Sequence, residues 1–167
     1  ATQMLERPNR PGVRLTNFWR TEQTPAEYDG ATETCTGPFI LHPPANGSVF
    51  RCVEFMPEDP EVMARLSSAD GAAAFAEMGA GANVVQGARH PWMHRTDSVD
   101  YGIVLTGEIW MLMDKEEDDV LLKAGDVRRG GLVGQSLGQE VVPGESRLHV
   151  DDLSGFAEPT REPEGLP

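Results

Sequence analysis

Residues 94–107 read HRTDSVDYGIVLTG, and this stretch decides the fold expected for the chain. Its second half is apolar and ends on a Thr-Gly turn signal, which indicates a strand closed by a tight turn. Side chains alternate between the two faces of a strand. If residues 94–101 are extended, one face therefore carries four polar side chains, those of His94, Thr96, Ser98 and Asp100.

His94 and Asp100 are the residues of this face that carry chemistry. An imidazole and a carboxylate that converge inside a β-barrel could hold a divalent metal ion. They could equally form a general acid/base pair, in which the carboxylate fixes the imidazole tautomer. The residues alone leave both alternatives open.

The sequence around this stretch is a series of short strands separated by turns rich in Gly and Pro. Residues 60–78 are the exception and predict a helix, with Asp59 as its N-cap and a possible break at Gly71. Short strands at regular spacing indicate an all-β sandwich or barrel. The expected strands are residues 15–20, 48–55, 101–105, 108–113 and 120–122, with possible edge strands at 140–142 and 147–150.

A single domain is expected, because 167 residues suffice for one sizeable core. Residues 1–14 contain prolines and no periodicity, and we expect a flexible N-terminal arm there. The barrel domain is expected over residues 15–153, with a divergent, glycine-rich part at 128–153. Residues 154–167 are expected to be a disordered tail.

The overall charge is acidic, with 27 Asp and Glu against 14 Lys and Arg. This balance argues against nucleic acid or an anionic membrane as partner, because both attract basic surfaces. The sequence contains neither an apolar run of membrane-spanning length nor the apolar core of a signal peptide. Its two cysteines lack a metal or disulfide spacing, so we expect thiols and a cytoplasmic location.

Residues 94–107 resemble the first motif of the cupin superfamily, which has two histidines, a glutamate and a closing glycine. Asp100 lies at the glutamate position and Gly107 at the glycine position, while His94 and Thr96 lie at the two histidine positions. The resemblance covers roughly residues 15–127, which are similar to small single-domain cupins. Two departures stand out, since Thr96 replaces a histidine and Asp100 replaces the glutamate.

The second cupin motif, which normally supplies another histidine, is not recognisable after residues 125–126. His149 follows a Pro-Gly pair that echoes this motif, but it lies late and out of register. The ligand that normally completes the metal site is therefore missing or relocated.

The resemblance implies a single cupin barrel that forms homodimers and binds a small molecule. We expect a lyase-type enzyme (decarboxylase, dehydratase or isomerase), with an iron-dependent dioxygenase and a non-catalytic binding protein as alternatives. The cofactor is expected to be either absent or a divalent metal such as Fe, Zn, Mn or Ni. The residues expected to act are His94, Asp100 and Arg51 in catalysis, Thr96, Tyr101, Trp110 and His90 in substrate binding, and His94, Asp100 and His149 as metal ligands.

Overall fold

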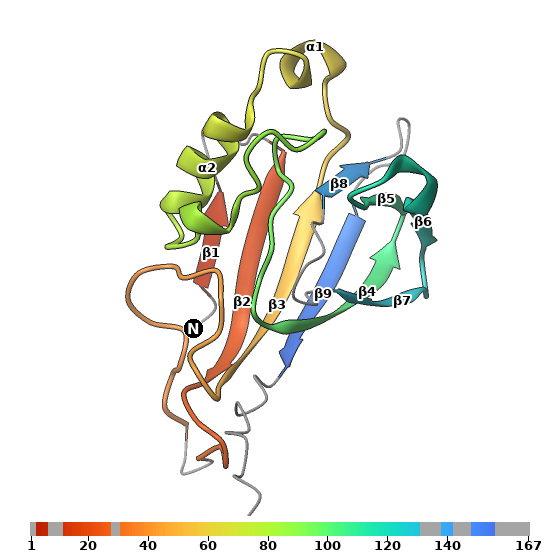
Figure 1. Cartoon of the computed structure of the whole chain (residues 1–167). Coiled ribbons are helices and arrows are strands. Elements are labelled where there is room, and N and C mark those ends of the chain that lie inside the picture. Colours follow the sequence, from red (N-terminus) through yellow and green to blue (C-terminus); the bar gives the residue numbers. More distant parts are fainter. Residues whose placement is uncertain (1–2, 7–11, 28–30, 131–137, 142–147, 156–167) are drawn as a thin grey trace, which may run out of the picture.

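The computed structural model describes residues 3–6, 12–27, 31–130, 138–141 and 148–155 (Figure 1). Two antiparallel sheets dominate it. The larger sheet has six strands in the order β1 (Gln3–Glu6), β2 (Val13–Thr21), β3 (Ser48–Phe55), β9 (Leu148–Gly155), β4 (Val99–Thr106) and β7 (Val127–Gly130). The smaller sheet has three strands in the order β6 (Val120–Lys123), β5 (Glu108–Leu112) and β8 (Gly138–Val141).

Most of the expected strands are present, and β3 has the predicted bounds. Two expectations about the ends need correction. The predicted flexible arm contains β1, which pairs with β2 from Gln3↔Asn17 to Glu6↔Arg14. Backbone pairing thus orders a segment whose side chains show no periodicity. The predicted disordered tail begins inside β9, and its remainder, residues 156–167, lies outside the described residues.

The single predicted helix is two short helices, α1 (Pro60–Met63) and α2 (Ser68–Ala76). The side chain of Asp59 caps α1 as expected. The break falls before Gly71, at Ser67, because Ser67 and Asp70 form a capping box that starts a new helix. The described residues also contain two single-turn 3₁₀ helices, at Gly81–Asn83 and Glu116–Asp118. None of the helices in the described residues is long and apolar enough to cross a membrane.

The hydrophobic core lies between the two sheets and α2. The large sheet contributes Leu15, Val53 and Val104, and the small sheet contributes Ile109 and Leu122. Phe75 of α2 and Trp92 close the core. Gly107, with φ of +75°, makes the turn by which the chain passes from β4 to β5 and so from one sheet to the other.

The described strands form two separate sheets rather than one closed barrel. The fold class is therefore confirmed as mostly β with few helices, whereas the single closed barrel stays a prediction.

Candidate active site

The segment that leads into β4 is less regular than the sequence predicts. β4 begins only at Val99, and residues 97 and 98 form a bend. His94 instead makes an isolated bridge to Val84, and the backbone N–H of Arg95 donates to the Asn83 carbonyl at 2.9 Å. The assumption of one extended run from 94 to 101 is therefore wrong, because local pairing with residues 83–84 competes with it.

Asp100 lies on the core side of β4. Asp100 lies four residues before Val104 on β4, and side chains an even number of residues apart share one face of a strand. Val104 is 2% exposed, so this is the buried face. Ser98 Oγ donates to Asp100 Oδ1 at 2.8 Å, and Thr96 Oγ1 donates to Oδ2 at 3.5 Å. The structure thus brings three of the four predicted polar residues together around one carboxylate.

The His94 ring is held from two sides. Nδ1 lies 2.9 Å from the Trp92 carbonyl oxygen, and the ring centroid lies 4.8 Å from that of Phe75. A carbonyl only accepts hydrogen bonds, so Nδ1 carries the proton in this contact. In the neutral ring, Nε2 then holds the lone pair, which is the arrangement required of a general base or a metal ligand.

A pocket of about 390 Å³ lies beside the Asp100 network. Thr96 and Ser98 line it, so the two hydroxyls that hold Asp100 also face this space. Asn83 and Asp97 add polar groups to the lining. His42, Pro43 and Pro44 line the pocket from the segment before β3. This volume falls in the lower part of the range of about 300–1,000 Å³ typical of small-molecule sites.

Arg51 is 2% exposed and makes structural contacts. Its Nε donates to Asn17 Oδ1 at 2.8 Å, and Nη2 donates to the Leu41 carbonyl at 2.7 Å. The guanidinium also lies over the Phe39 ring, 5.4 Å from its centroid. These contacts tie the segment around residues 39–41 to β2 and β3, and binding of an anionic substrate group by Arg51 stays a prediction.

Tyr101 and Trp110 lie away from the Asp100 network. Tyr101 is 44% exposed on the opposite face of β4, and Trp110 is 38% exposed on β5 between the buried Ile109 and Met111. Strand alternation explains both positions. Their predicted roles in substrate binding therefore gain no support from the geometry.

His90 is buried, and it pairs with Glu58. His90 Nε2 lies 3.3 Å from Glu58 Oε2, and the exposed fractions of the two side chains are 11% and 18%. Sequence reasoning missed Glu58, because it lies 32 residues before its partner in an irregular linker between β3 and α1.

The backbone register separates His149 from Asp100. His149 pairs with Thr106, six residues along β4 from Asp100, which corresponds to about 20 Å at roughly 3.3 Å per residue. The register lends no support to a metal site shared by the two residues, and the role of His149 as a metal ligand stays a prediction. Among the described side chains, no three His, Cys, Asp or Glu residues form a group that could hold a metal ion.

No family model matches the chain. Two curated relatives from Diaporthe leptostromiformis, Phomopsin biosynthesis cluster protein C' and protein D, are each 57% identical to it over 35 residues. That match covers 21% of this chain and 18% of each relative, so it spans less than a fifth of their length.

Solved structures match over most of the chain. The Fe(II) form of HppE has a TM-score of 0.52 at 13% identity, and the match covers 92% of this chain and 56% of that one. HppE with the alternative substrate (S)-1-HPP has a TM-score of 0.51. KdgF from Halomonas sp. has a TM-score of 0.45 at 12% identity, covering 87% of this chain and 82% of that one. The likeness to HppE shows that the chain has a cupin-like fold.

Proposed function

We propose that this protein is a small-molecule enzyme of lyase or isomerase type that uses His94 and Asp100 for acid–base chemistry. The observation that carries the proposal is the contact between His94 Nδ1 and the Trp92 carbonyl at 2.9 Å. This contact leaves the lone pair of the neutral ring on Nε2, which can take a proton from a substrate and return it.

Asp100 orients the site in this proposal. Its carboxylate accepts hydrogen bonds from Ser98 and Thr96, and both hydroxyls line the neighbouring pocket. A substrate in that pocket would meet hydroxyl groups that already have fixed orientations. A small carbonyl- or carboxylate-bearing molecule suits such hydroxyl donors. Asp97 lines the same pocket and would disfavour highly charged anions.

The Fe(II) in HppE favours a second candidate, a metal-dependent oxygenase. His94 and Asp100 are of the residue types that bind iron, but a facial site needs a third protein ligand. The described residues bring no third ligand to them. The side chains present therefore fit the metal incompletely.

The test compares variants in a substrate screen. Small β-keto acids, hydroxy acids and enolisable ketones are incubated with the protein in D₂O, and NMR follows CO₂ loss, dehydration and deuterium uptake. For any compound that turns over, His94→Ala should lower the rate by roughly 100- to 10,000-fold, because it removes the proton-transfer group. Asp100→Asn should also lower the rate.

Leu105→Ala is the control, because Leu105 is 46% exposed on β4 and does not line the pocket, so this variant should leave the rate unchanged. Undiminished turnover by His94→Ala would refute the acid–base role.

Elemental analysis of the purified protein separates the two candidates. Stoichiometric iron that is lost in His94→Ala would favour the oxygenase.

A further inference from the structure

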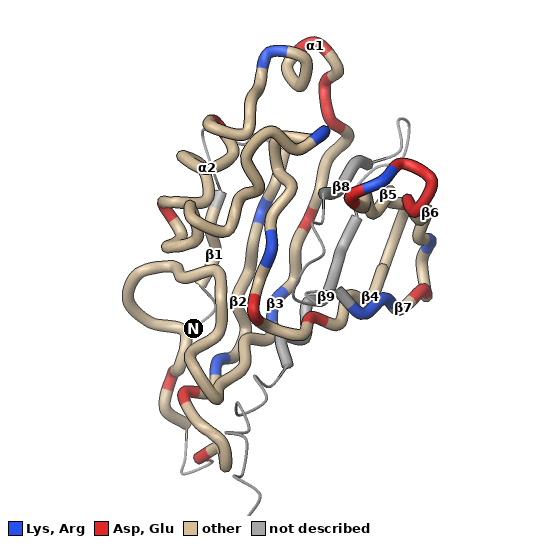
Figure 2. Tube along the Cα trace, viewed as in Figure 1, with Lys and Arg blue, Asp and Glu red and all other residues tan. Residues whose placement is uncertain are grey.

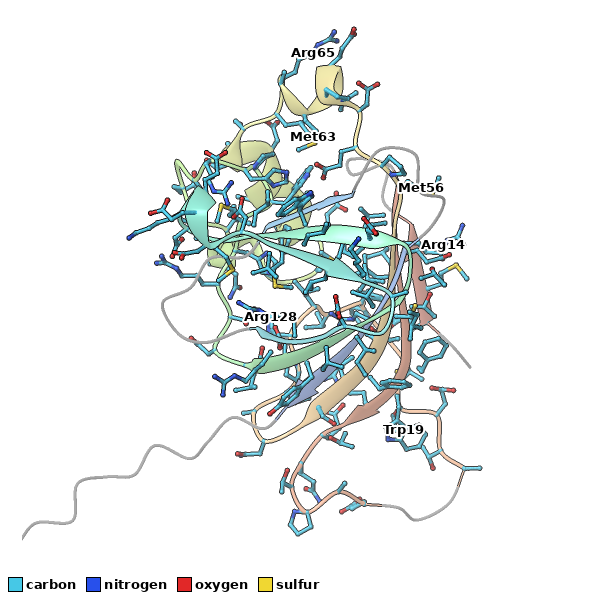
Figure 3. All side chains as sticks on the ribbon, turned by 90° about the vertical axis from the view of Figure 1, so that its right-hand side faces the viewer. Arg14, Trp19, Met56, Met63, Arg65 and Arg128 are labelled. Carbon is cyan, nitrogen blue, oxygen red and sulfur yellow. The ribbon has the colours of Figure 1, made fainter. Side chains whose placement is uncertain are left out.

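A second pocket opens between α1 and the end of β3, and we call it the α1 pocket. It has a volume of about 330 Å³. Figure 3 shows two of its lining residues, Met56 and Met63, at the end of the molecule that carries Arg65. Its apolar wall includes Met56, Val62, Met63, Leu66 and Trp92.

The polar groups of the α1 pocket are acidic. Glu58 and Asp59 line it, and none of the described lining residues is Lys or Arg. The Asp59 carboxylate already accepts the backbone N–H of Glu61 at 2.8 Å, as the cap of α1. Glu58 is therefore the carboxylate that can meet a ligand.

His90 holds Glu58 in place. The backbone N–H of Trp92 donates to His90 Nδ1 at 3.4 Å, so the ring carries its proton at Nε2 and donates it to Glu58 Oε2 at 3.3 Å. Arg89 anchors the same loop, because its Nε donates to the Met113 carbonyl at 2.9 Å. Within the described part of the chain, Glu58 Oε1 has no hydrogen-bond partner.

We propose that the α1 pocket binds a small molecule that has an apolar body and a protonated amine. The apolar wall would bury the body, and Glu58 Oε1 would accept a hydrogen bond from the ammonium group. Hydrogen bonds between an ammonium and a carboxylate are about twice as strong as neutral ones. The low exposure of Glu58, 18%, limits competition from water. His90 is the positioning residue that orients the carboxylate.

Three probes of similar size test the proposal by isothermal titration calorimetry: phenethylamine, phenethyl alcohol and 3-phenylpropionate. Phenethylamine should bind at least about tenfold more tightly than the alcohol, because only the amine makes a charge-assisted bond. The propionate should bind most weakly, because Glu58 and Asp59 repel its carboxylate. Equal affinities for the three probes, or no binding of phenethylamine, would overturn the proposal.

Variants assign the binding to this pocket. Glu58→Gln should abolish the preference for the amine, whereas Glu61→Gln should keep it, because the Glu61 side chain is 86% exposed outside the pocket. Val62→Trp should fill the pocket and weaken phenethylamine binding at least about tenfold. Val62 is 42% exposed, so this substitution does not disturb the core and serves if Glu58→Gln fails to fold. A preference that survives both substitutions overturns the proposal.

Asp100→Asn separates this inference from the proposed function. Asp100 is hydrogen-bonded to Thr96 and Ser98, and none of the three lines the α1 pocket, so the variant should bind phenethylamine as the unmodified protein does.

Discussion

At the scale of single residues, Gly71 sets how closely α2 approaches the segment that carries His90 and His94. A Cβ atom at this position would lie 2.0 Å from the Pro91 carbonyl oxygen and 3.5 Å from Val84 Cγ1. Helix propensity alone favours alanine over glycine by about 1 kcal/mol. The clash with a backbone atom outweighs this gain, because neither the helix nor the buried loop can move freely.

Gly71→Ala should therefore lower the free energy of unfolding by about 1–3 kcal/mol, measured by urea denaturation. Ala69→Gly is the matched control at an exposed position of the same helix. It should cost about 1 kcal/mol through propensity alone. If Gly71→Ala stabilises the protein, the close approach of α2 to Pro91 is contradicted.

Residue identity and spacing predict part of the candidate site. Asp100 lies on the core face as the two-residue period requires, with Thr96 and Ser98 as its partners. The pair of His90 and Glu58 could not be found this way, because it joins an irregular linker to a distant loop. Pairs of this kind depend on the path of the chain through space, which local spacing does not encode.

At the scale of elements, α2 owes its start to the capping box of Ser67 and Asp70. Hydrogen bonds from the Ser67 side chain and backbone lower the pKa of the Asp70 carboxyl. A carboxyl whose pKa is lower in the folded state stabilises the fold above its unfolded pKa. That contribution is lost as the pH falls through the lowered value.

Ser67→Ala should reduce stability at pH 7 by about 1 kcal/mol, as expected for a lost N-cap. The pKa of Asp70 should rise towards its ordinary value, which NMR titration of the carboxyl measures directly. Asp70→Asn is the companion variant. It should lack the loss of stability that protonation of the Asp70 carboxylate causes at acidic pH. An unchanged Asp70 pKa in Ser67→Ala would contradict the role of the hydroxyl.

Local pattern predicts elements well where both periodicity and turn signals are strong. β3 has its predicted bounds, because polar and apolar residues largely alternate over residues 48–55 and a turn precedes it, with Asn46 at φ of +63°. The pattern fails to predict the place of β9, which inserts between β3 and β4 in the large sheet. Pairing between segments that lie far apart in the sequence depends on the whole fold and not on propensity.

At the scale of the whole molecule, the large sheet carries aromatic residues on its outer face. Phe18 and Phe50 are in contact, with ring centroids 5.7 Å apart, and Tyr101 is also exposed. Figure 3 shows Trp19 at the end of the molecule opposite Arg65. Homodimer formation stays a prediction, and this face is where an aromatic contact between copies is available.

The net charge of −13 is the other property of the whole molecule that has a measurable consequence. Figure 2 shows acidic residues gathered in the connection between β5 and β6. Repulsion among like charges is greater in the compact state than in the expanded unfolded chain, so it destabilises the fold. Salt weakens this repulsion, because the Debye length falls from about 30 Å at 0.01 M to about 8 Å at 0.15 M.

The midpoint of thermal unfolding should therefore rise by a few degrees between about 0.01 M and 0.3 M NaCl. Salt also weakens surface ion pairs such as Arg65–Glu61 at 3.8 Å, but exposed pairs contribute only about 0–1 kcal/mol each. Replacing Glu116 and Glu117 together by Gln should reduce the salt dependence, because both lie in the acidic connection. A midpoint that falls as NaCl is added would mean that ion pairs outweigh the repulsion. Calorimetry in chloride rather than sulfate avoids the separate stabilisation caused by excluded salts.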